Sequence, residues 1–181
     1  MRLLQAATSQ LLLIDFQQRL MPAIHDAEAV LANAQRLALL APQVGVPVWG
    51  TEQSVDKLGP NVAPLRAACG ATLSKTAFGA CADGLLDLLR PALAAGRAQL
   101  VLAGCEAHVC LLQTALGLRD AGHDVWVVAD ACGSRAATSH AAAMARLAAA
   151  GATLVTTEMV GFEWLATAGH PAFRAWQALI R

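Results

Sequence analysis

The sequence predicts a three-layer α/β/α sandwich with a parallel sheet as its middle layer. Short apolar runs of strand length alternate along the 181 residues with longer segments of helical periodicity. This alternation is typical of parallel βαβ units, in which helices cover both faces of the sheet. The sequence contains no linker-like stretch and no internal repeat. We therefore expect a single domain over residues 1–181, long enough to bury one large core.

The first half of the chain is predicted to supply three strands and two helices. The first strand is a run of four aliphatic residues that stops at Asp15. The first helix has apolar residues at helical spacing and stops at Ala41 and Pro42, and Pro91 predicts a kink in the second. In chain order the elements are strand 11–14, helix 27–40, strand 46–49, a polar loop over 51–64, strand 71–74 and helix 84–95.

The second half continues the alternation with three further strands. The apolar run 99–103 is too short for a helix and is interrupted by Gly104. A helical pattern follows it and ends near Gly122. The remaining predicted elements are helix 107–121, strand 124–129 closed by Asp130, helix 138–150, strand 153–155, and two short helices at 159–166 and 171–180.

The composition favours an oligomer and excludes several kinds of partner. The chain is 56% hydrophobic and 14% charged, so we expect a homo-oligomer, with the apolar C-terminal segment as an interface. Its formal net charge is zero and it has no basic block, so neither nucleic acid nor a membrane surface is an expected partner. The N-terminus is interpreted as a first strand rather than a signal peptide. Five irregularly spaced cysteines indicate free thiols and a cytoplasmic setting.

Three polar residues at predicted strand ends are the candidates for chemistry. Asp15 follows the first strand, Lys75 follows the third, and Cys110 lies in the first helical turn after the fourth. The carboxyl ends of parallel strands meet at one edge of a sheet, where such folds place their sites. The free N–H groups and positive dipole end of a helix favour a thiolate at Cys110. The sequence therefore predicts an acid, a cation and an activated thiol in one site.

Each candidate also has an ordinary structural interpretation. Asp15 and Lys75 are consistent with a structural ion pair, and a cysteine such as Cys110 is commonly a small core residue. His108 is not expected to act as a base for Cys110, because residues two apart on a helix face nearly opposite ways. The histidines lack metal-binding spacing and the chain lacks glycine-rich nucleotide-binding motifs, so no metal or cofactor is expected.

The chain resembles the isochorismatase-like cysteine hydrolases in four segments. They read Leu-Leu-Ile-Asp-Phe-Gln, Ser-Lys-Thr-Ala-Phe, Ala-Gly-Cys-Glu-Ala-His-Val-Cys and Val-Val-Ala-Asp-Ala-Cys-Gly-Ser-Arg, in the order and spacing of that family. The resemblance implies a Rossmann-like fold with six parallel strands, in which the first and fourth are neighbours at the topological switch point. It also implies a catalytic triad of Asp15, Lys75 and Cys110, and a non-proline cis peptide between Cys105 and Glu106.

Two departures from the family bear on the substrate. The nicotinamidase branch has a metal-binding Asp/His cluster after the second strand, whereas this chain has Thr51, Glu52 and Gln53 and no histidine there. True isochorismatases resemble this fold but lack the nucleophilic cysteine, so Cys110 favours amide-type hydrolysis over vinyl-ether cleavage. The Thr-Glu-Gln stretch is similar to the branch of isochorismatase-domain proteins.

The sequence thus predicts a metal-independent cysteine hydrolase that cleaves a small amide-type C–N bond through a thioester on Cys110. Backbone N–H groups of Glu106 and Cys110, in the turn that starts at Cys105, are the expected oxyanion hole. Two other functions stay open: a thiol redox sensor that uses Cys110 with or without Cys105, and a non-catalytic oligomeric scaffold. The expected substrate contacts are an apolar wall of Phe16, Trp49 and Phe78, together with Glu52 and Gln53, which are equally consistent with loop hydrogen bonds.

Overall fold

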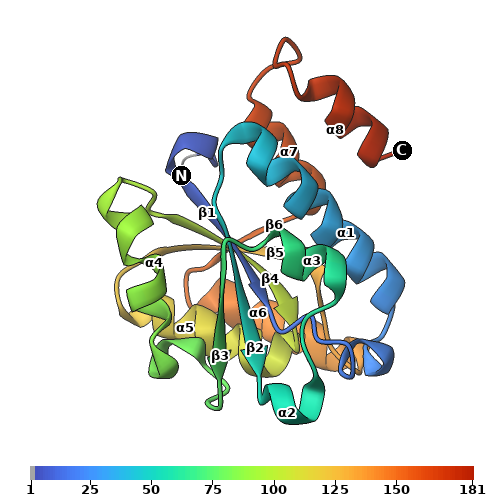
Figure 1. The fold of residues 1–181 in the computed structure, drawn as a ribbon, viewed down its shortest axis with the longest axis vertical. Helices are drawn as coiled ribbons and strands as arrows, with labels where there is room; N and C mark the ends of the chain where they lie inside the picture. Colours follow the sequence, from blue (N-terminus) through green and yellow to red (C-terminus); the bar gives the residue numbers. More distant parts are fainter. Residues whose placement is uncertain (1–2) are drawn as a thin grey trace.

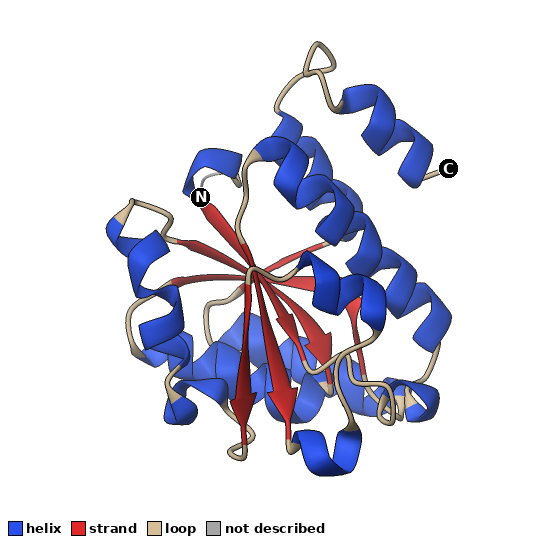
Figure 2. Ribbon diagram, viewed as in Figure 1, coloured by secondary structure: helices blue, strands red, loops and turns tan. Residues whose placement is uncertain are grey.

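The computed structural model describes residues 3–181 as helices packed around one parallel sheet (Figure 1; Figure 2). The strand order is β3-β2-β1-β4-β5-β6, and every neighbouring pair is parallel. This confirms the predicted six-stranded α/β/α sandwich. The strands are β1 (Ser9–Ile14), β2 (Val48–Gln53), β3 (Ala71–Lys75), β4 (Gln99–Cys105), β5 (Asp124–Gly133) and β6 (Thr153–Val155).

Helices α1 to α6 lie in the connections between the strands, as the alternating pattern predicts, and α7 and α8 follow the last strand. The α-helices of the described residues are α1 (Ala27–Leu40), α2 (Val55–Leu58), α3 (Ala63–Ala68), α4 (Leu85–Ala94), α5 (Leu112–Asp120), α6 (Ala137–Ala149), α7 (Thr157–Leu165) and α8 (Phe173–Leu179). Short 3-10 turns are η1 (Ala6–Thr8), η2 (Met21–Ala23), η3 (Ala41–Val44) and η4 (Ala80–Asp83), and η5 (Ala107–Leu111) is a π-helical turn.

The first strand stands at the topological switch point of the sheet. Leu11 of β1 pairs with Val48 of β2 on one side and with Val101 of β4 on the other. The chain runs outward from β1 to β2 and β3, returns to β4 beside β1, and then runs outward to β5 and β6. The adjacency of the first and fourth strands that the resemblance implies is confirmed. The crevice at the carboxyl ends of such strands is where open α/β sheets place their sites.

Alternate residues of the central strands pack on opposite faces of the sheet. Leu11 and Leu13 belong to a core cluster shared with α1, α3, α7 and α8, whereas Leu12 and Ile14 belong to a second cluster shared with α4, α5 and α6. The period of two is that of an extended strand, and helices on both faces explain why the strands are apolar throughout. A side chain in one cluster is therefore separated by the sheet from a side chain in the other.

The C-terminal segment both caps the core and leaves apolar groups exposed. Trp176 of α8 is fully buried against Gly161 of α7, where a Cβ atom would lie 2.1 Å from the indole ring. Arg36 Nε donates to the carbonyl of Leu179 at 2.7 Å and ties α8 to α1. Phe162 remains 42% exposed. Figure 1 shows α8 at the periphery of the molecule, so the expected use of this segment as an interface remains a prediction.

Several predicted elements differ from the structure. Strand β2 continues through Gln53 and β5 through Gly133, so Asp130 lies inside β5 instead of closing it. The β2 extension pairs with β3, and Cys132 and Gly133 of the β5 extension pair with β4, so an apolar run alone does not reveal these strand ends. The predicted loop over 51–64 contains the end of β2, the short helix α2 and the start of α3.

The helix predicted over 107–121 begins with a different geometry. Residues Ala107–Leu111 form a π-helical turn, and the α-helix α5 starts only at Leu112. Hydrophobic spacing does not separate these two hydrogen-bonding patterns, and π turns are frequent at functional sites. Within residues 3–181, no helix combines the length and apolar character that a bilayer crossing demands.

Candidate active site

Asp15 is held in a fixed orientation directly after β1. Its side chain is fully buried, and its backbone φ of 52° lies in the left-handed region that is uncommon for residues other than glycine. Its N–H donates to the carbonyl of Thr51 at 3.2 Å, and its Oδ1 accepts from the hydroxyl of Thr51 at 2.6 Å. Both contacts come from the neighbouring strand β2, so the carboxylate is oriented by the sheet itself.

Lys75 at the end of β3 provides the positive charge that a buried carboxylate needs. Its Nζ is 2.7 Å from Asp15 Oδ2, and both side chains are completely buried. The ammonium also donates to Gln53 Oε1 at 2.7 Å and to the carbonyls of Phe78 and Ala77 at 3.1 and 3.4 Å. An ammonium has three N–H donors, and these four acceptors surround it. Lys75 is therefore a fixed cation held among protein acceptors.

Cys110 lies in the π turn that follows β4. It belongs to the same core cluster as Ile14 and is 6% exposed. Burial raises the pKa of its thiol to about 12; the Asp15 carboxylate contributes in the same direction, while Lys75 opposes the shift. The prediction of a resting thiolate is therefore wrong, because desolvation outweighs the nearby cation. The thiol is protonated at neutral pH and must lose its proton during any reaction.

Asp15 is the candidate acceptor for that proton, through the oxygen Oδ2 that the Thr51 hydroxyl leaves open. Among residues 3–181 this oxygen accepts no hydrogen bond of regular geometry, although Lys75 Nζ lies beside it. Asp15 and Lys75 both lie close enough to the Cys110 thiol to shift its pKa, Asp15 upward and Lys75 downward. Thr51 occupies the other oxygen, Oδ1. The structure thus brings together the acid, the cation and the thiol predicted from three separate strand ends.

The turn before Cys110 is anchored to the end of β5. The Cys105–Glu106 peptide is cis. Glu106 Oε2 accepts from both the backbone N–H and Nε of Arg135 at 3.0 Å. His108 Nδ1 lies 3.0 Å from the Ser134 hydroxyl, so His108 contacts β5's end and not Cys110. These contacts fix the backbone of the turn on which the expected oxyanion-hole donors lie.

Two of the aromatic residues expected to contact substrate lie elsewhere. Phe16 is fully buried in the core cluster on the opposite face of the sheet from Cys110. Trp49 is near the amino end of β2, opposite Leu12, and its Nε1 donates to Gln10 Oε1 at 2.8 Å. Both placements are corrections: closeness to a strand in sequence did not show which face or which end of the sheet a side chain occupies. Phe78, at 54% exposed on the Lys75 loop, remains a candidate.

Glu52 and Gln53 make structural contacts. Glu52 Oε1 accepts from the N–H of Asn61 at 2.9 Å and lies 3.7 Å from Arg66 Nε. Gln53 contacts Lys75 through its oxygen, and its Nε2 donates to the carbonyl of Thr76 at 2.7 Å. The interpretation as loop hydrogen-bonding groups therefore fits both residues better than substrate binding. Thr51 was missed as a site residue, and only its place at the end of β2, beside β1, signalled it.

Cys105 does not face Cys110. It is fully buried in the cluster on the opposite face of the sheet, and burial raises the pKa of its thiol well above the usual value. Cys69, Cys81, Cys105, Cys110 and Cys132 are free thiols. A redox pair between Cys105 and Cys110 is not assembled in this structure.

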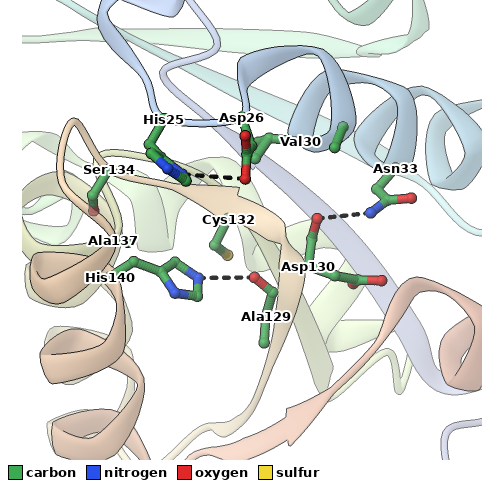
Figure 3. Close-up of a pocket in the computed structure, with 12 residues that line it drawn as sticks. His25, Asp26, Val30, Asn33, Ala129, Asp130, Cys132, Ser134, Ala137 and His140 are labelled. Carbon is green, nitrogen blue, oxygen red and sulfur yellow. Dashed lines mark hydrogen bonds and ion pairs between the residues drawn. The ribbon is translucent and has the colours of Figure 1, made fainter.

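A separate cavity of about 340 Å³ lies between the first turns of α1 and α6 and the end of β5 (Figure 3). Its lining includes Cys132 and the two histidines His25 and His140. His140 Nε2 lies 3.0 Å from the carbonyl of Ala129, and His25 Nδ1 lies 3.2 Å from Asp26 Oδ2. The lining does not include Asp15, Lys75 or Cys110. Within residues 3–181, no three His, Cys, Asp or Glu side chains are grouped as metal ligands.

The fold is that of an open α/β protein, with an acid, a cation and a cysteine at the carboxyl ends of its parallel strands. The chain belongs to the isochorismatase family: the family model of the isochorismatase domain matches residues 9–159. Membership in this family supports a hydrolase-type function and confirms the resemblance noted in the sequence.

The relatives extend over nearly the whole chain. Isochorismatase domain-containing protein 2A of Mus musculus is 36% identical over 177 residues, which cover 96% of this chain and 83% of that protein. The MAR1 ribonuclease of Caenorhabditis elegans has a TM-score of 0.90 and 30% identity, with 99% of this chain and 92% of that one covered. The YcaC protein of Escherichia coli, described as an octameric hydrolase of unknown specificity, has a TM-score of 0.86 and 25% identity over 99% and 95% of the two chains.

Proposed function

We propose that this chain is a metal-independent cysteine hydrolase that cleaves a small amide-type C–N bond, with Cys110 as nucleophile. The observation that carries the proposal is the fully buried ion pair of Asp15 and Lys75 beside the Cys110 thiol. A buried ion pair is costly to desolvate, and a hydrophobic pair often packs as well. Its position against a cysteine at the switch point favours a catalytic role over a structural one.

Acylation starts with the protonated thiol. As Cys110 Sγ attacks the carbonyl carbon of the substrate, Asp15 Oδ2 takes the S–H proton. The new S–C bond gives a tetrahedral oxyanion, for which the N–H groups of Glu106 and Cys110 are the proposed donors. The C–N bond then breaks, Asp15 passes its proton to the leaving nitrogen, and a thioester remains on Cys110.

Deacylation runs through the same groups. A water molecule attacks the thioester carbonyl while Asp15 accepts one of its protons. The C–S bond breaks, the acid product leaves, and the proton on Asp15 returns to the Cys110 sulfur. Lys75 stays in place beside Asp15, where its ammonium also contacts Gln53 Oε1 and the Phe78 carbonyl.

A solved relative supports a reactive nucleophile in this fold. The YcaC protein of Pseudomonas aeruginosa has a TM-score of 0.86 and 27% identity over 99% of this chain and 96% of that one, and it carries covalent acrylamide. Acrylamide is an electrophilic amide to which thiols add. For this chain we propose small amide-like substrates, with Phe78 as an apolar contact at the Lys75 loop.

A screen for released ammonia or amine tests the proposal. Wild type, Cys110→Ser and Cys132→Ser would be incubated with small amides, ureas and imides, with and without a chelator. We expect turnover of at least one substrate by wild type and Cys132→Ser, no turnover by Cys110→Ser, and no effect of the chelator. Equal activity in Cys110→Ser, or loss of activity with the chelator, would reject the proposal.

The second candidate is a non-catalytic oligomeric scaffold. The specific observation that favours it is the low exposure of Cys110, at 6%. Octameric assembly is described for the E. coli relative, and we propose that this chain also forms a homo-oligomer. Turnover that depends on Cys110 would reject the scaffold role as the sole function.

A further inference from the structure

Strand β2 carries two polar side chains that each touch one member of the ion pair. The hydroxyl of Thr51 donates to Asp15 Oδ1 at 2.6 Å, and Gln53 Oε1 accepts from Lys75 Nζ at 2.7 Å. Residues two apart on a strand lie on the same face. Both side chains belong to buried residues. A strand that supplies no member of the triad therefore contacts both of its charges.

Thr51 holds Asp15 at two points. Its carbonyl accepts from the Asp15 N–H at 3.2 Å, and its hydroxyl donates to Oδ1. The left-handed backbone of Asp15 persists only where the surroundings determine it, and these two contacts do so. With Oδ1 engaged, the carboxylate presents Oδ2 to Lys75, and the same carboxylate acts on the Cys110 thiol.

Gln53 is fixed by contacts of its own. Its backbone N–H donates to Gln17 Oε1 at 2.8 Å, and its Nε2 donates to the carbonyl of Thr76 and to the Ser54 hydroxyl at 2.7 and 3.2 Å. Because the amide nitrogen is committed to these acceptors, the amide oxygen faces Lys75. Gln53 also lies directly opposite Lys75 in the β2–β3 register. Its polar groups are therefore all engaged within the protein.

We propose that Thr51 and Gln53 are positioning residues that give the two oxygens of Asp15 different tasks. Thr51 holds Oδ1, so Oδ2 is the oxygen that takes the proton from Cys110 and later passes it to the leaving nitrogen. Gln53 holds the Lys75 ammonium against that same oxygen. The catalytic part of this inference rests on the proposed function, whereas the effect on the thiol does not.

Loss of the Thr51 hydroxyl has two consequences of opposite sign. A donor to a carboxylate stabilises its charged form, so its removal makes Asp15 a stronger base. The arrangement with the proton on Oδ2 and a thiolate on Cys110 then becomes more populated. The same protonated Asp15 is a weaker acid toward the leaving nitrogen. Reactivity of the thiol should therefore rise while amide turnover falls, and general damage to the site would lower both.

Thr51→Val and Thr51→Ser provide a matched test. The rate of Cys110 alkylation by chloroacetamide would be measured at pH 7 by peptide mass spectrometry, together with kcat and KM for an amide found in the screen. We expect Thr51→Val to alkylate about tenfold faster and to lose about tenfold in kcat with KM unchanged, the size of one hydrogen bond to a charged group. Thr51→Ser should restore both rates. A fall of both rates, or serine behaving like valine, would overturn the proposal.

Gln53→Glu tests the role of Gln53 independently of Thr51, because glutamate and glutamine side chains have nearly the same shape. A second carboxylate beside Lys75 competes with Asp15 for the ammonium and adds negative charge near the thiol. We expect Cys110 alkylation to slow about tenfold, and an unchanged rate would contradict the role of Gln53 even if Thr51→Val does not fold. Alkylation involves no hydrolysis. A wild type without amidase activity would reject the proposed function, while the alkylation rates would still decide the positioning roles.

Discussion

Cys110 and Cys132 differ in their neighbours far more than in their burial. Both belong to the same core cluster, at 6% and 3% exposed, and burial raises the pKa of each thiol to about 12. Cys132 lines the cavity of Figure 3, whereas Cys110 lies beside Asp15 and Lys75. The comparison teaches that neither a raised pKa nor an open cavity identifies a nucleophile. The feature that singles out Cys110 in our proposal is the adjacent carboxylate and ammonium, a candidate base and a cation.

Removal of the Lys75 cation, which Cys110 has beside it and Cys132 lacks, is expected to have the largest effect on stability and turnover. Lys75→Met leaves the buried Asp15 carboxylate without its partner, so we expect a loss of about 3–5 kcal/mol in the free energy of unfolding and loss of turnover. Asp15→Asn combined with Lys75→Met removes both charges. The double variant should regain much of the stability in urea denaturation but no turnover.

Additive stability losses in the double variant would show that the two residues are not coupled as a buried ion pair. Turnover by the double variant would show that the pair is structural and that Cys110 works without it.

Alkaline pH should affect the two thiols alike. For each, the folded-state pKa of about 12 lies above the ordinary value of 9.0. A buried thiol therefore adds stability that is fully present below pH 9 and is lost as pH rises from 9 toward 12. The free energy of unfolding should fall by about 1.4 kcal/mol per pH unit for each such thiol. Cys132→Ala and Cys110→Ala each remove one such thiol. Each should therefore reduce the pH dependence of the free energy of unfolding by about 1.4 kcal/mol per pH unit, as measured by urea denaturation between pH 8 and 10.5.

A slope that Cys132→Ala leaves unchanged would show that this thiol titrates normally. A change in Cys132→Ala alone would show that the Cys110 thiol ionises more easily than its burial indicates, in favour of a resting thiolate.

The smallest expected effect concerns Phe78, the remaining candidate for an apolar contact with the substrate. Phe78→Ala should raise KM about threefold to tenfold through lost apolar contact, with little change in kcat. Trp49→Ala, which alters the opposite end of the sheet, is the matched control and should leave KM unchanged. Steady-state kinetics on the same amide would give KM for both variants. A larger change of KM in Trp49→Ala than in Phe78→Ala would show that Trp49 contacts the substrate after all.

Local sequence patterns were sufficient for most of the fold. The boundaries of α1 at Ala27 and Leu40 match the predicted helix, because apolar spacing and the Ala-Pro stop both mark it. The ends of β2 and β5 were not predictable from apolar runs. Thr51, Glu52 and Gln53 of β2 are polar but buried, and the exposed Asp130 interrupts the apolar pattern of β5. The π turn before α5 was also missed, because its period is too close to that of an α-helix.

The site was predictable in its charges and not in its supporting contacts. The rule that strand ends meet at one edge brought Asp15, Lys75 and Cys110 together from sequence. It did not show that desolvation would keep the thiol protonated, since burial depends on the whole packed core. Nor did it show that Thr51 orients Asp15, because that contact depends on the register between β1 and β2.

We propose that Cys110, and not Cys132, is the nucleophile. The most direct test is to mix the protein with a reactive small amide or ester, quench with acid within seconds, and map the acyl group by mass spectrometry. Our account predicts an acyl adduct on Cys110 that decays with turnover and is absent in Cys110→Ala and in the Asp15→Asn, Lys75→Met variant. An adduct on Cys132, or turnover with no acyl-enzyme at all, would contradict it.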